Sequence, residues 1–145
     1  MSKAFDCALR LLARREHGAN ELAEKLAHKG FARQDIENAV DKCQQLNYQS
    51  DERFIAAFCR QRIGQGYGPQ RIIQELQLKR LDKDLIMEIL NGQEVSWDTL
   101  AREVMQKKFR QIEGQDFKAL QKQQRFLQSR GFSFEIINKL FKDEF

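Results

Sequence analysis

The chain is poor in the residues that commonly build β-strands. Its valine and threonine content is limited to Val40, Val95, Val104 and Thr99, and strands normally draw on both residue types. Gln, Leu, Lys, Arg, Glu and Ala dominate instead, and all six are good helix formers. There is a single proline, Pro69, so few segments are barred from helix. We therefore expect an all-α protein.

Long apolar runs and a cysteine framework are also missing. No run approaches the roughly 18 apolar residues that cross a bilayer, and the N-terminus lacks the apolar stretch of a secretory signal. The three cysteines, Cys7, Cys43 and Cys59, are far apart and form no Cys-x-x-Cys motif. The only histidines, His17 and His28, are too few for a histidine-based metal site. We expect a reduced, cytoplasmic protein with no metal ion and no cofactor.

Catalytic motifs are equally scarce. The spacing of Gly64, Gly66 and Gly68 resembles that of a phosphate-binding loop. However, no Lys-Ser/Thr pair follows these glycines and no strand is expected before them. We interpret the segment from Gly64 to Gly68 as a connector between helices. No candidate nucleophile has a histidine base at a suitable spacing. The sequence therefore argues against an enzyme.

Helix-ending and helix-starting residues divide the chain into nine short helices. Gly30 suits a left-handed C-terminal position, Ser50 can cap the helix that follows it, and Pro69 suits a first helical position. The expected helices cover about 4–15, 20–29 and 33–47, begin at 51 and 69, and cover about 82–91, 97–112, 116–130 and 133–142.

A threefold internal repeat is the strongest signal in the sequence. Six positions recur with identical internal spacing, at offsets of 50 and then 51 residues. They are Leu26, Lys29, Gly30, Phe31, Ile36 and Val40, then Leu76, Lys79, Arg80, Leu81, Ile86 and Leu90, then Leu127, Arg130, Gly131, Phe132, Ile137 and Phe141. This pattern predicts three tandem three-helix repeats, at 1–50, 51–96 and 97–145, stacked into an elongated array suited to a long partner. A compact bundle of the three repeats is the alternative.

Positive charge is concentrated in two windows. The net charge is +4. Residues 53–80 contain six basic residues and one acidic residue, and residues 102–130 contain eight basic and three acidic residues, so each window is +5. Such clustering favours an anionic partner, either phosphates or an acidic protein surface. A solvated helix face is the alternative.

Helical spacing arranges some of these cations into stripes. Arg53 and Arg60 are seven residues apart and should share a face opposite Phe54, Ile55 and Phe58. Lys118, Lys122 and Arg125 should form a second stripe, away from Phe117, Leu120 and Leu127. Tyr67 in the glycine-rich segment could stack on a base or a partner side chain, or anchor its own loop.

Several motifs make the sequence recognisable. Leu46-Asn47-Tyr48 with Asp51-Glu52-Arg53-Phe54, and Gly66-Tyr67-Gly68-Pro69 with Arg71-Ile72-Ile73-Gln74-Glu75-Leu76, resemble the RecX family of bacterial recombination regulators. The first repeat is similar through Ala8-Leu9-Arg10-Leu11-Leu12, Glu21-Leu22 and Lys29-Gly30-Phe31. Arg80 is a departure, since the repeat usually carries glycine there, and it puts the turn after Lys79 in question.

The resemblance implies arrays of three-helix repeats that bind the RecA recombinase, particularly its filament on single-stranded DNA. Such proteins inhibit RecA ATP hydrolysis, strand exchange and co-protease activity, and so damp recombination and the SOS response. Some members also bind DNA directly. We expect the partner-binding residues to be Arg53, Arg60, Tyr67, Arg71 and Lys79 in the second repeat, and Lys107, Arg110, Lys118, Lys122 and Arg125 in the third.

Two other functions remain open on the residues alone. A helix-turn-helix-like DNA-binding protein acting without RecA would also carry the basic stripes and the many glutamines. A scaffold without any link to nucleic acid would show no salt-dependent affinity for polyanions.

Overall fold

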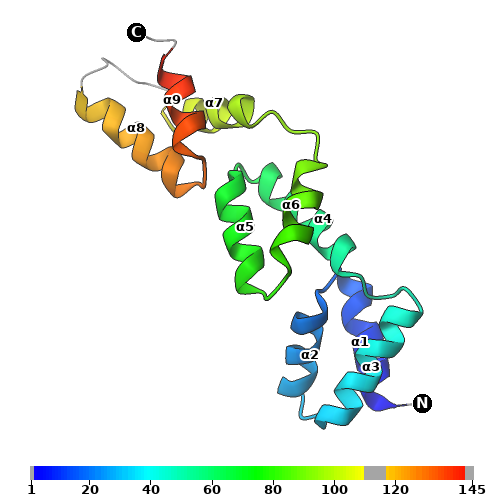
Figure 1. Cartoon of the computed structure of the whole chain (residues 1–145). Coiled ribbons are helices and arrows are strands. Elements are labelled where there is room, and N and C mark those ends of the chain that lie inside the picture. Colours follow the sequence, from blue (N-terminus) through cyan, green and yellow to red (C-terminus); the bar gives the residue numbers. More distant parts are fainter. Residues whose placement is uncertain (1, 110–116, 143–145) are drawn as a thin grey trace. The chain divides into compact units, whose positions relative to one another are not determined.

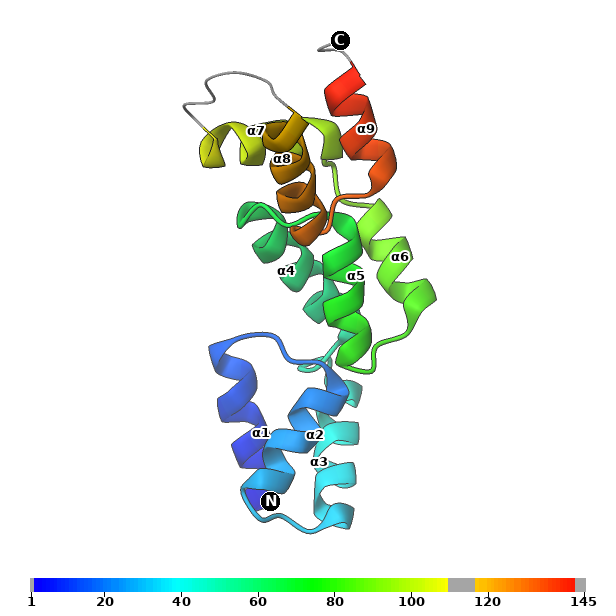
Figure 2. The ribbon, with the colours of Figure 1, turned by 90° about the vertical axis from the view of Figure 1, so that its left-hand side faces the viewer.

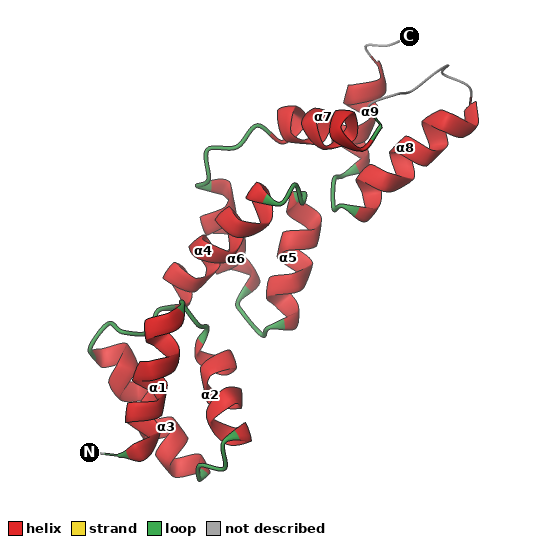
Figure 3. Ribbon diagram, turned by 180° about the vertical axis from the view of Figure 1, so that it is seen from behind, coloured by secondary structure: helices red, strands yellow, loops and turns green. Residues whose placement is uncertain are grey.

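The computed structural model describes residues 2–109 and 117–142, and within these ranges it contains helices and loops but no strand (Figure 1 and Figure 3). Nine helices are present in the described residues. They are α1 (Lys3–Arg14), α2 (Ala19–His28), α3 (Arg33–Gln45), α4 (Asp51–Gly64), α5 (Pro69–Leu78), α6 (Lys83–Asn91), α7 (Trp97–Lys108), α8 (Phe117–Ser129) and α9 (Phe134–Lys142). The all-α expectation is confirmed. Helix α7 was expected to extend to about 112, but it ends at Lys108, and residues 110–112 lie outside the described residues. The bounds of the other helices agree with the expected ranges to within about two residues.

Helix α1 begins at a serine cap and packs against α2 and α3 (Figure 2). The Ser2 hydroxyl accepts a hydrogen bond from the Phe5 amide at 3.0 Å, which satisfies one of the open N–H groups of the first turn. The core of this helical trio is contributed by small and branched apolar residues of all three helices. Its buried members are Ala4, Phe5, Cys7, Ala8, Leu22, Leu26, Ile36, Ala39, Val40 and Cys43.

Among the next three helices, α4 and α5 begin where the sequence predicts, and α4 ends one residue later than expected. The Ser50 hydroxyl accepts from the Arg53 amide at 3.2 Å, so Ser50 caps α4. Pro69 is the first residue of α5. Gly64 was expected in the connecting loop, but α4 continues through it and the loop begins one residue later. The buried apolar residues of these helices are Phe54, Ile55, Phe58, Cys59, Ile72, Leu76, Leu81, Ile86 and Leu90.

Helix α7 is also capped by a serine, and it packs against α8 and α9. The Ser96 hydroxyl accepts from the Thr99 amide at 3.3 Å. The buried core residues are Ala101, Met105, Leu127, Phe132, Ile137, Leu140 and Phe141. Phe117 was expected on the core side of α8, but it is 74% exposed. It is the first residue of α8, whereas the buried face of that helix is set by Gln123 and Leu127.

The same turn connects the second and third helices of each trio. Its central residues are Gly30, Arg80 and Gly131, with φ of 90°, 63° and 99°. In each copy the following amide returns to the carbonyl five residues earlier, at 3.3, 3.4 and 3.1 Å. This pattern of bonds around a left-handed residue satisfies carbonyls at the helix end. Arg80 therefore preserves the turn that the two glycines make, so the question raised by the missing glycine is answered.

The described contacts divide the chain into two compact units. The first comprises Met1–Phe58 and Leu76–Ile89, and the second comprises Cys59–Glu75 and Leu90–Phe145. Residues of α4, α5 and α6 are therefore shared between the two units. In the part of the chain that the structure describes, every helix is too short or too polar to cross a membrane.

Candidate binding surface

Tyr67 lies at the centre of an arginine cluster in the second unit. Gly66, with φ of 85°, turns the chain out of α4 and places Tyr67 before α5. The Arg71 guanidinium carbon lies 4.2 Å from the centre of the Tyr67 ring, and the Arg130 carbon lies 4.7 Å from it. Arg62 is more distant, at 5.9 Å. Cations in this range are attracted to the ring face, so one phenol ring organises guanidinium groups from α4, α5 and the end of α8.

A single carboxylate balances part of this charge. Glu75 Oε2 accepts from Arg62 Nε at 2.7 Å, and Glu75 Oε1 accepts from Arg71 Nε at 3.1 Å. Burial by itself would raise the pKa of Glu75, but the hydrogen bonds from the two arginines outweigh it and leave the pKa below its usual value. Glu75 is therefore ionised at neutral pH and committed to Arg62 and Arg71.

Main-chain atoms join α5 to the turn between α8 and α9. The Gly68 amide donates to the Arg130 carbonyl at 2.8 Å, and the Gln70 amide donates to the Gly131 carbonyl at 3.0 Å. A Cβ atom added to Gly68 would lie 2.5 Å from the Gly131 carbonyl, and one added to Gly131 would lie 2.4 Å from Arg71 Cβ. Only glycine allows so close an approach, so the two glycines hold Arg130 against the Tyr67 ring.

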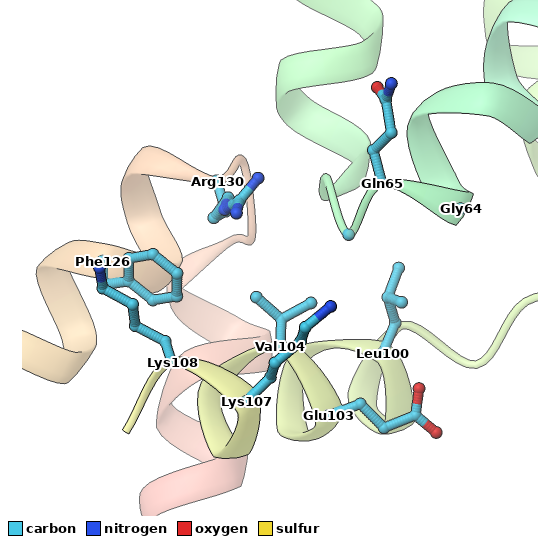
Figure 4. Close-up of a pocket in the computed structure, with 10 residues that line it drawn as sticks. Gly64, Gln65, Leu100, Glu103, Val104, Lys107, Lys108, Phe126 and Arg130 are labelled. Atoms are coloured by element: carbon cyan, nitrogen blue, oxygen red, sulfur yellow. The ribbon is translucent and has the colours of Figure 1, made fainter. Parts of the chain in front are cut away.

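A cavity of about 460 Å³ lies beside this cluster, within the second unit (Figure 4). The end of α4 and its turn, one face of α7 and the last turns of α8 form its walls. Its lining residues are Gly64, Gln65, Gly66, Leu100, Glu103, Val104, Lys107, Lys108, Phe126 and Arg130. Phe126 is held in place by an edge-to-face contact with Phe109, with 5.5 Å between ring centres. The cavity therefore combines apolar side chains with three cations and one carboxylate.

Three family models match consecutive parts of the chain. They are described as the first, second and third three-helix domains of RecX, and they match residues 4–43, 50–90 and 98–141. The chain belongs to the RecX family. It is 49% identical over 143 residues to the regulatory protein RecX of Legionella pneumophila (strain Corby), covering 99% of this chain and 95% of that protein. The corresponding protein of Vibrio vulnificus (strain CMCP6) is 42% identical over 144 residues, covering 99% and 94%.

A solved RecX structure shows the same fold. The crystal structure of RecX from Lactobacillus salivarius superimposes with a TM-score of 0.84, covering 97% of this chain and 94% of that one at 19% sequence identity. The predicted RecX family and its three-helix domains are confirmed by the family models, whereas the predicted boundaries at 50/51 and 96/97 stay predictions. The curated relatives are named regulatory proteins.

The predicted partner-binding residues of the third RecX domain lie mostly in the open. Lys118, Lys122 and Arg125 are all exposed on α8, as the stripe predicts. Lys107 is exposed on α7 and lines the cavity. Arg110 lies outside the described residues.

The predicted residues of the second RecX domain differ from one another in their surroundings. Arg60 is exposed on α4. Tyr67 and Arg71 are brought together in the arginine cluster, where Arg71 Nη1 also donates to the Ser129 carbonyl at 3.3 Å. Lys79 belongs to the first unit, and its Nζ lies 3.7 Å from Glu21 Oε2.

Arg53 is more deeply engaged than its position on a basic stripe indicates. Its Nε donates to Glu16 Oε1 at 3.1 Å. Its two terminal nitrogens donate to the Asn47 side-chain oxygen at 2.9 Å and to the Asn47 carbonyl at 2.8 Å. Asn47 has φ of 62°, so Arg53 fixes a left-handed residue in the loop between α3 and α4. Its proposed contact with a partner stays a prediction, and its structural role is evident.

Sequence reasoning missed Arg130, Lys108 and Phe126 as members of the same surface. Arg130 occupies the repeat position of Lys79, which was chosen. That correspondence could have identified it, because the turns after α5 and α8 have the same geometry. Phe126 could not have been found this way, since its repeat equivalents are Lys25 and Glu75.

A buried histidine organises the polar side of the first unit. His17 Nδ1 lies 3.0 Å from the Arg15 carbonyl, and Nε2 lies 2.9 Å from Lys25 Nζ. A proton on Nδ1 satisfies both contacts, because Nε2 is then free to accept from the ammonium group. Burial lowers the pKa of His17 despite the hydrogen bond to the Arg15 carbonyl, and the charges of Arg15 and Lys25 lower it further.

The described residues offer no cluster of three His, Cys, Asp or Glu side chains for a metal ion. Cys7, Cys43 and Cys59 are buried and free. Burial raises the pKa of the Cys59 thiol to about 11, although the charge of Arg60 opposes the shift. Cys59 is therefore a core thiol that is protonated at neutral pH.

Proposed function

We propose that this RecX-family protein binds the RecA recombinase and its filament on single-stranded DNA. In this role it inhibits RecA ATP hydrolysis, strand exchange and co-protease activity, and so modulates recombination, DNA repair and the SOS response in the cytoplasm. The observation that carries the proposal is the match of all three three-helix domains, in order, to the RecX family. The RecA partner itself follows from what that family resemblance implies.

The distribution of exposed cations supports an anionic filament as the partner. The stripe on α8 presents Lys118, Lys122 and Arg125, and none of the three forms an ion pair with a carboxylate in the described residues. Like charges at these spacings repel one another slightly. An acidic protein groove or a phosphate backbone would remove that repulsion.

Three domains on one chain favour binding to a polymeric partner over binding to a single RecA subunit. Once one domain is bound, the others act at a high effective concentration, so several modest contacts give tight binding to a filament. Binding that holds adjacent RecA subunits in one arrangement would oppose the changes that ATP turnover requires. Inhibition then needs no catalytic group on this chain.

The decisive experiment measures single-stranded-DNA-dependent RecA ATPase activity with and without the protein. We expect inhibition that saturates at or below one molecule per RecA subunit. Unchanged ATPase activity from substoichiometric to excess ratios would remove the proposal. Strand-exchange and co-protease assays then show whether the other two activities fall together with ATP hydrolysis.

A DNA-binding protein that acts without RecA is the second candidate. The exposed cations of α8, on a three-helix domain, favour it as well. It predicts sequence-dependent binding to duplex DNA at moderate salt in the absence of RecA. ATPase inhibition that persists where duplex binding is undetectable would exclude it.

A further inference from the structure

The domain repeat brings together different charges at two equivalent places. An offset of 50 relates Glu21 to Arg71, and an offset of 51 relates Lys79 to Arg130. In the first unit the earlier pair is a carboxylate facing an ammonium group, 3.7 Å apart. In the second unit both equivalents are guanidinium groups held on one tyrosine ring. Among the described residues, the second unit therefore has two cations at the place where the first unit has an ion pair.

Among the described residues, Arg130 has no carboxylate partner. Glu75 is shared between Arg62 and Arg71. Arg130 contacts the Tyr67 ring and also the Phe126 ring, at 5.5 Å, but no carboxylate of the described residues. Aromatic faces stabilise a guanidinium group without neutralising it, so a positive charge remains at the edge of the cavity.

Two lysines of α7 reach the same cavity. Lys108 Nζ lies 5.8 Å from the centre of the Phe126 ring, which Arg130 also contacts. Lys107 lines the cavity as well and has no ion-pair partner in the described part of the chain. In Figure 4 the carboxylate of Glu103 points away from Arg130 and Phe126. The two lysine side chains point to opposite sides of the cavity, that of Lys107 toward Leu100 and that of Lys108 toward Phe126 (Figure 4).

Apolar side chains of α7 form one wall of the cavity. Leu100 and Val104 project from α7 toward the turn that follows α4 (Figure 4). A Cβ atom on Gly66 would lie 2.8 Å from Val104 Cγ2, so the glycine allows this turn to sit directly on α7. The volume of about 460 Å³ is in the range of small-ligand pockets.

We propose that this cavity binds one nucleotide unit, with the base against Leu100 and Val104 and the phosphate at Arg130 and one of the two lysines, Lys107 or Lys108. A flat, apolar ring joined to an anion matches both halves of the cavity. An acidic peptide carries its carboxylates and its aromatic rings on separate residues, whereas a nucleotide joins the ring and the anion in one unit. The nucleotide unit comes either from a free nucleotide or from a single strand. This proposal does not depend on RecA.

The test uses the full chain without RecA at low ionic strength. Fluorescence anisotropy would follow binding of N-methylanthraniloyl-ADP and, separately, of a fluorescein-labelled short oligothymidylate. We expect saturable binding of at least one probe, weakened about tenfold or more by the double variant Lys107→Ala/Lys108→Ala, because charge-assisted hydrogen bonds to phosphate are lost. Circular dichroism would verify that the variant is folded.

A matched control separates the cavity from general charge. The double variant Arg10→Ala/Arg14→Ala removes two charges from exposed positions of α1, which do not line the cavity. We expect this variant to bind the probes with an affinity within about twofold of that of the unmodified chain.

Binding of the ADP probe assigns the cavity to free nucleotides, and binding of the oligothymidylate alone assigns it to a strand. Absence of saturable binding for both probes, or equal losses in the two double variants, would overturn the proposal. RecA ATPase inhibition is measured separately, so either proposal can fail alone.

Discussion

At the scale of single residues, the turn at Arg80 shows how position can override residue preference. A left-handed conformation costs a residue with a side chain roughly 1–2 kcal/mol, yet Arg80 adopts it with φ of 63°. Its carbonyl accepts from Asn20 Nδ2 at 3.3 Å, and its amide donates to the Gln77 carbonyl at 3.0 Å. These bonds and the surrounding helices hold the residue in place.

Arg80→Gly should therefore stabilise the protein. Glycine removes the side-chain strain but increases the entropy of the unfolded chain, so the expected net gain is about 1 kcal/mol. A thermal melt should show Tm rising by roughly 2 to 4 °C. Arg80→Ala, which keeps a Cβ atom, serves as the control and should give no comparable gain. A lower Tm for the glycine variant would contradict the account.

His17 should make stability depend on pH. Its folded-state pKa lies below the unfolded value of 6.5, so the folded state favours neutral imidazole. The resulting stability is complete above pH 6.5 and is lost as pH falls through the lower folded-state pKa. Its slope for one proton is at most about 1.4 kcal/mol per pH unit.

The comparison protein for this effect is His17→Asn, whose amide nitrogen can replace Nδ1 in the bond to the Arg15 carbonyl. Urea unfolding at several pH values gives the free energy of unfolding for both proteins. The difference between them should narrow as the pH drops below 6.5, because only the original chain must protonate a buried imidazole. A difference independent of pH would show that His17 does not titrate as described.

At the scale of helices, the sequence predicted most of what the structure contains. The starts of helices could be predicted from the sequence, because serine caps and Pro69 act on the neighbouring residues. The core was readable from the repeat, whose buried positions recur at fixed spacing. Contacts between residues far apart in the sequence could not be predicted from it. The pairing of Arg53 with Glu16 and the stacking of Arg130 on Tyr67 depend on packing, which a helical period alone does not specify.

Helix α8 carries the clearest test of the proposed partner surface. Reversing its stripe with Lys118→Glu, Lys122→Glu and Arg125→Glu should raise the concentration needed for half-inhibition of RecA ATPase by about tenfold or more. All three side chains are exposed, so Tm should change little. Reversal of three exposed cations of the first domain, Arg10, Arg14 and Arg33, produces the same change in net charge. Equal losses in both triple variants would point to net charge rather than to α8.

At the scale of the whole molecule, charge should make the proposed inhibition sensitive to salt. The net charge is only +4, but two sequence windows are each +5. Attraction between exposed charges is screened within about 8 Å at physiological ionic strength. Half-inhibition of RecA ATPase should therefore require more protein at about 200 mM salt than at about 50 mM, because salt weakens the binding of basic proteins to polyanions. The RecA activity measured alone at each salt concentration is the reference. Inhibition that is indifferent to salt would argue for an apolar contact surface.

The close meeting of Gly68 and Gly131 has a consequence for how such a protein can change over time. The joint between α5 and the turn after α8 is made by amides and carbonyls and requires only the two glycines, not the side chains around it. Side chains around the joint can therefore be exchanged, altering what the rim of the neighbouring cavity attracts, while the joint itself keeps its geometry. Main-chain atoms fix the fold at this joint, and side chains at the cavity rim determine what binds there. Substitutions at the rim can therefore change the binding preference without changing the fold.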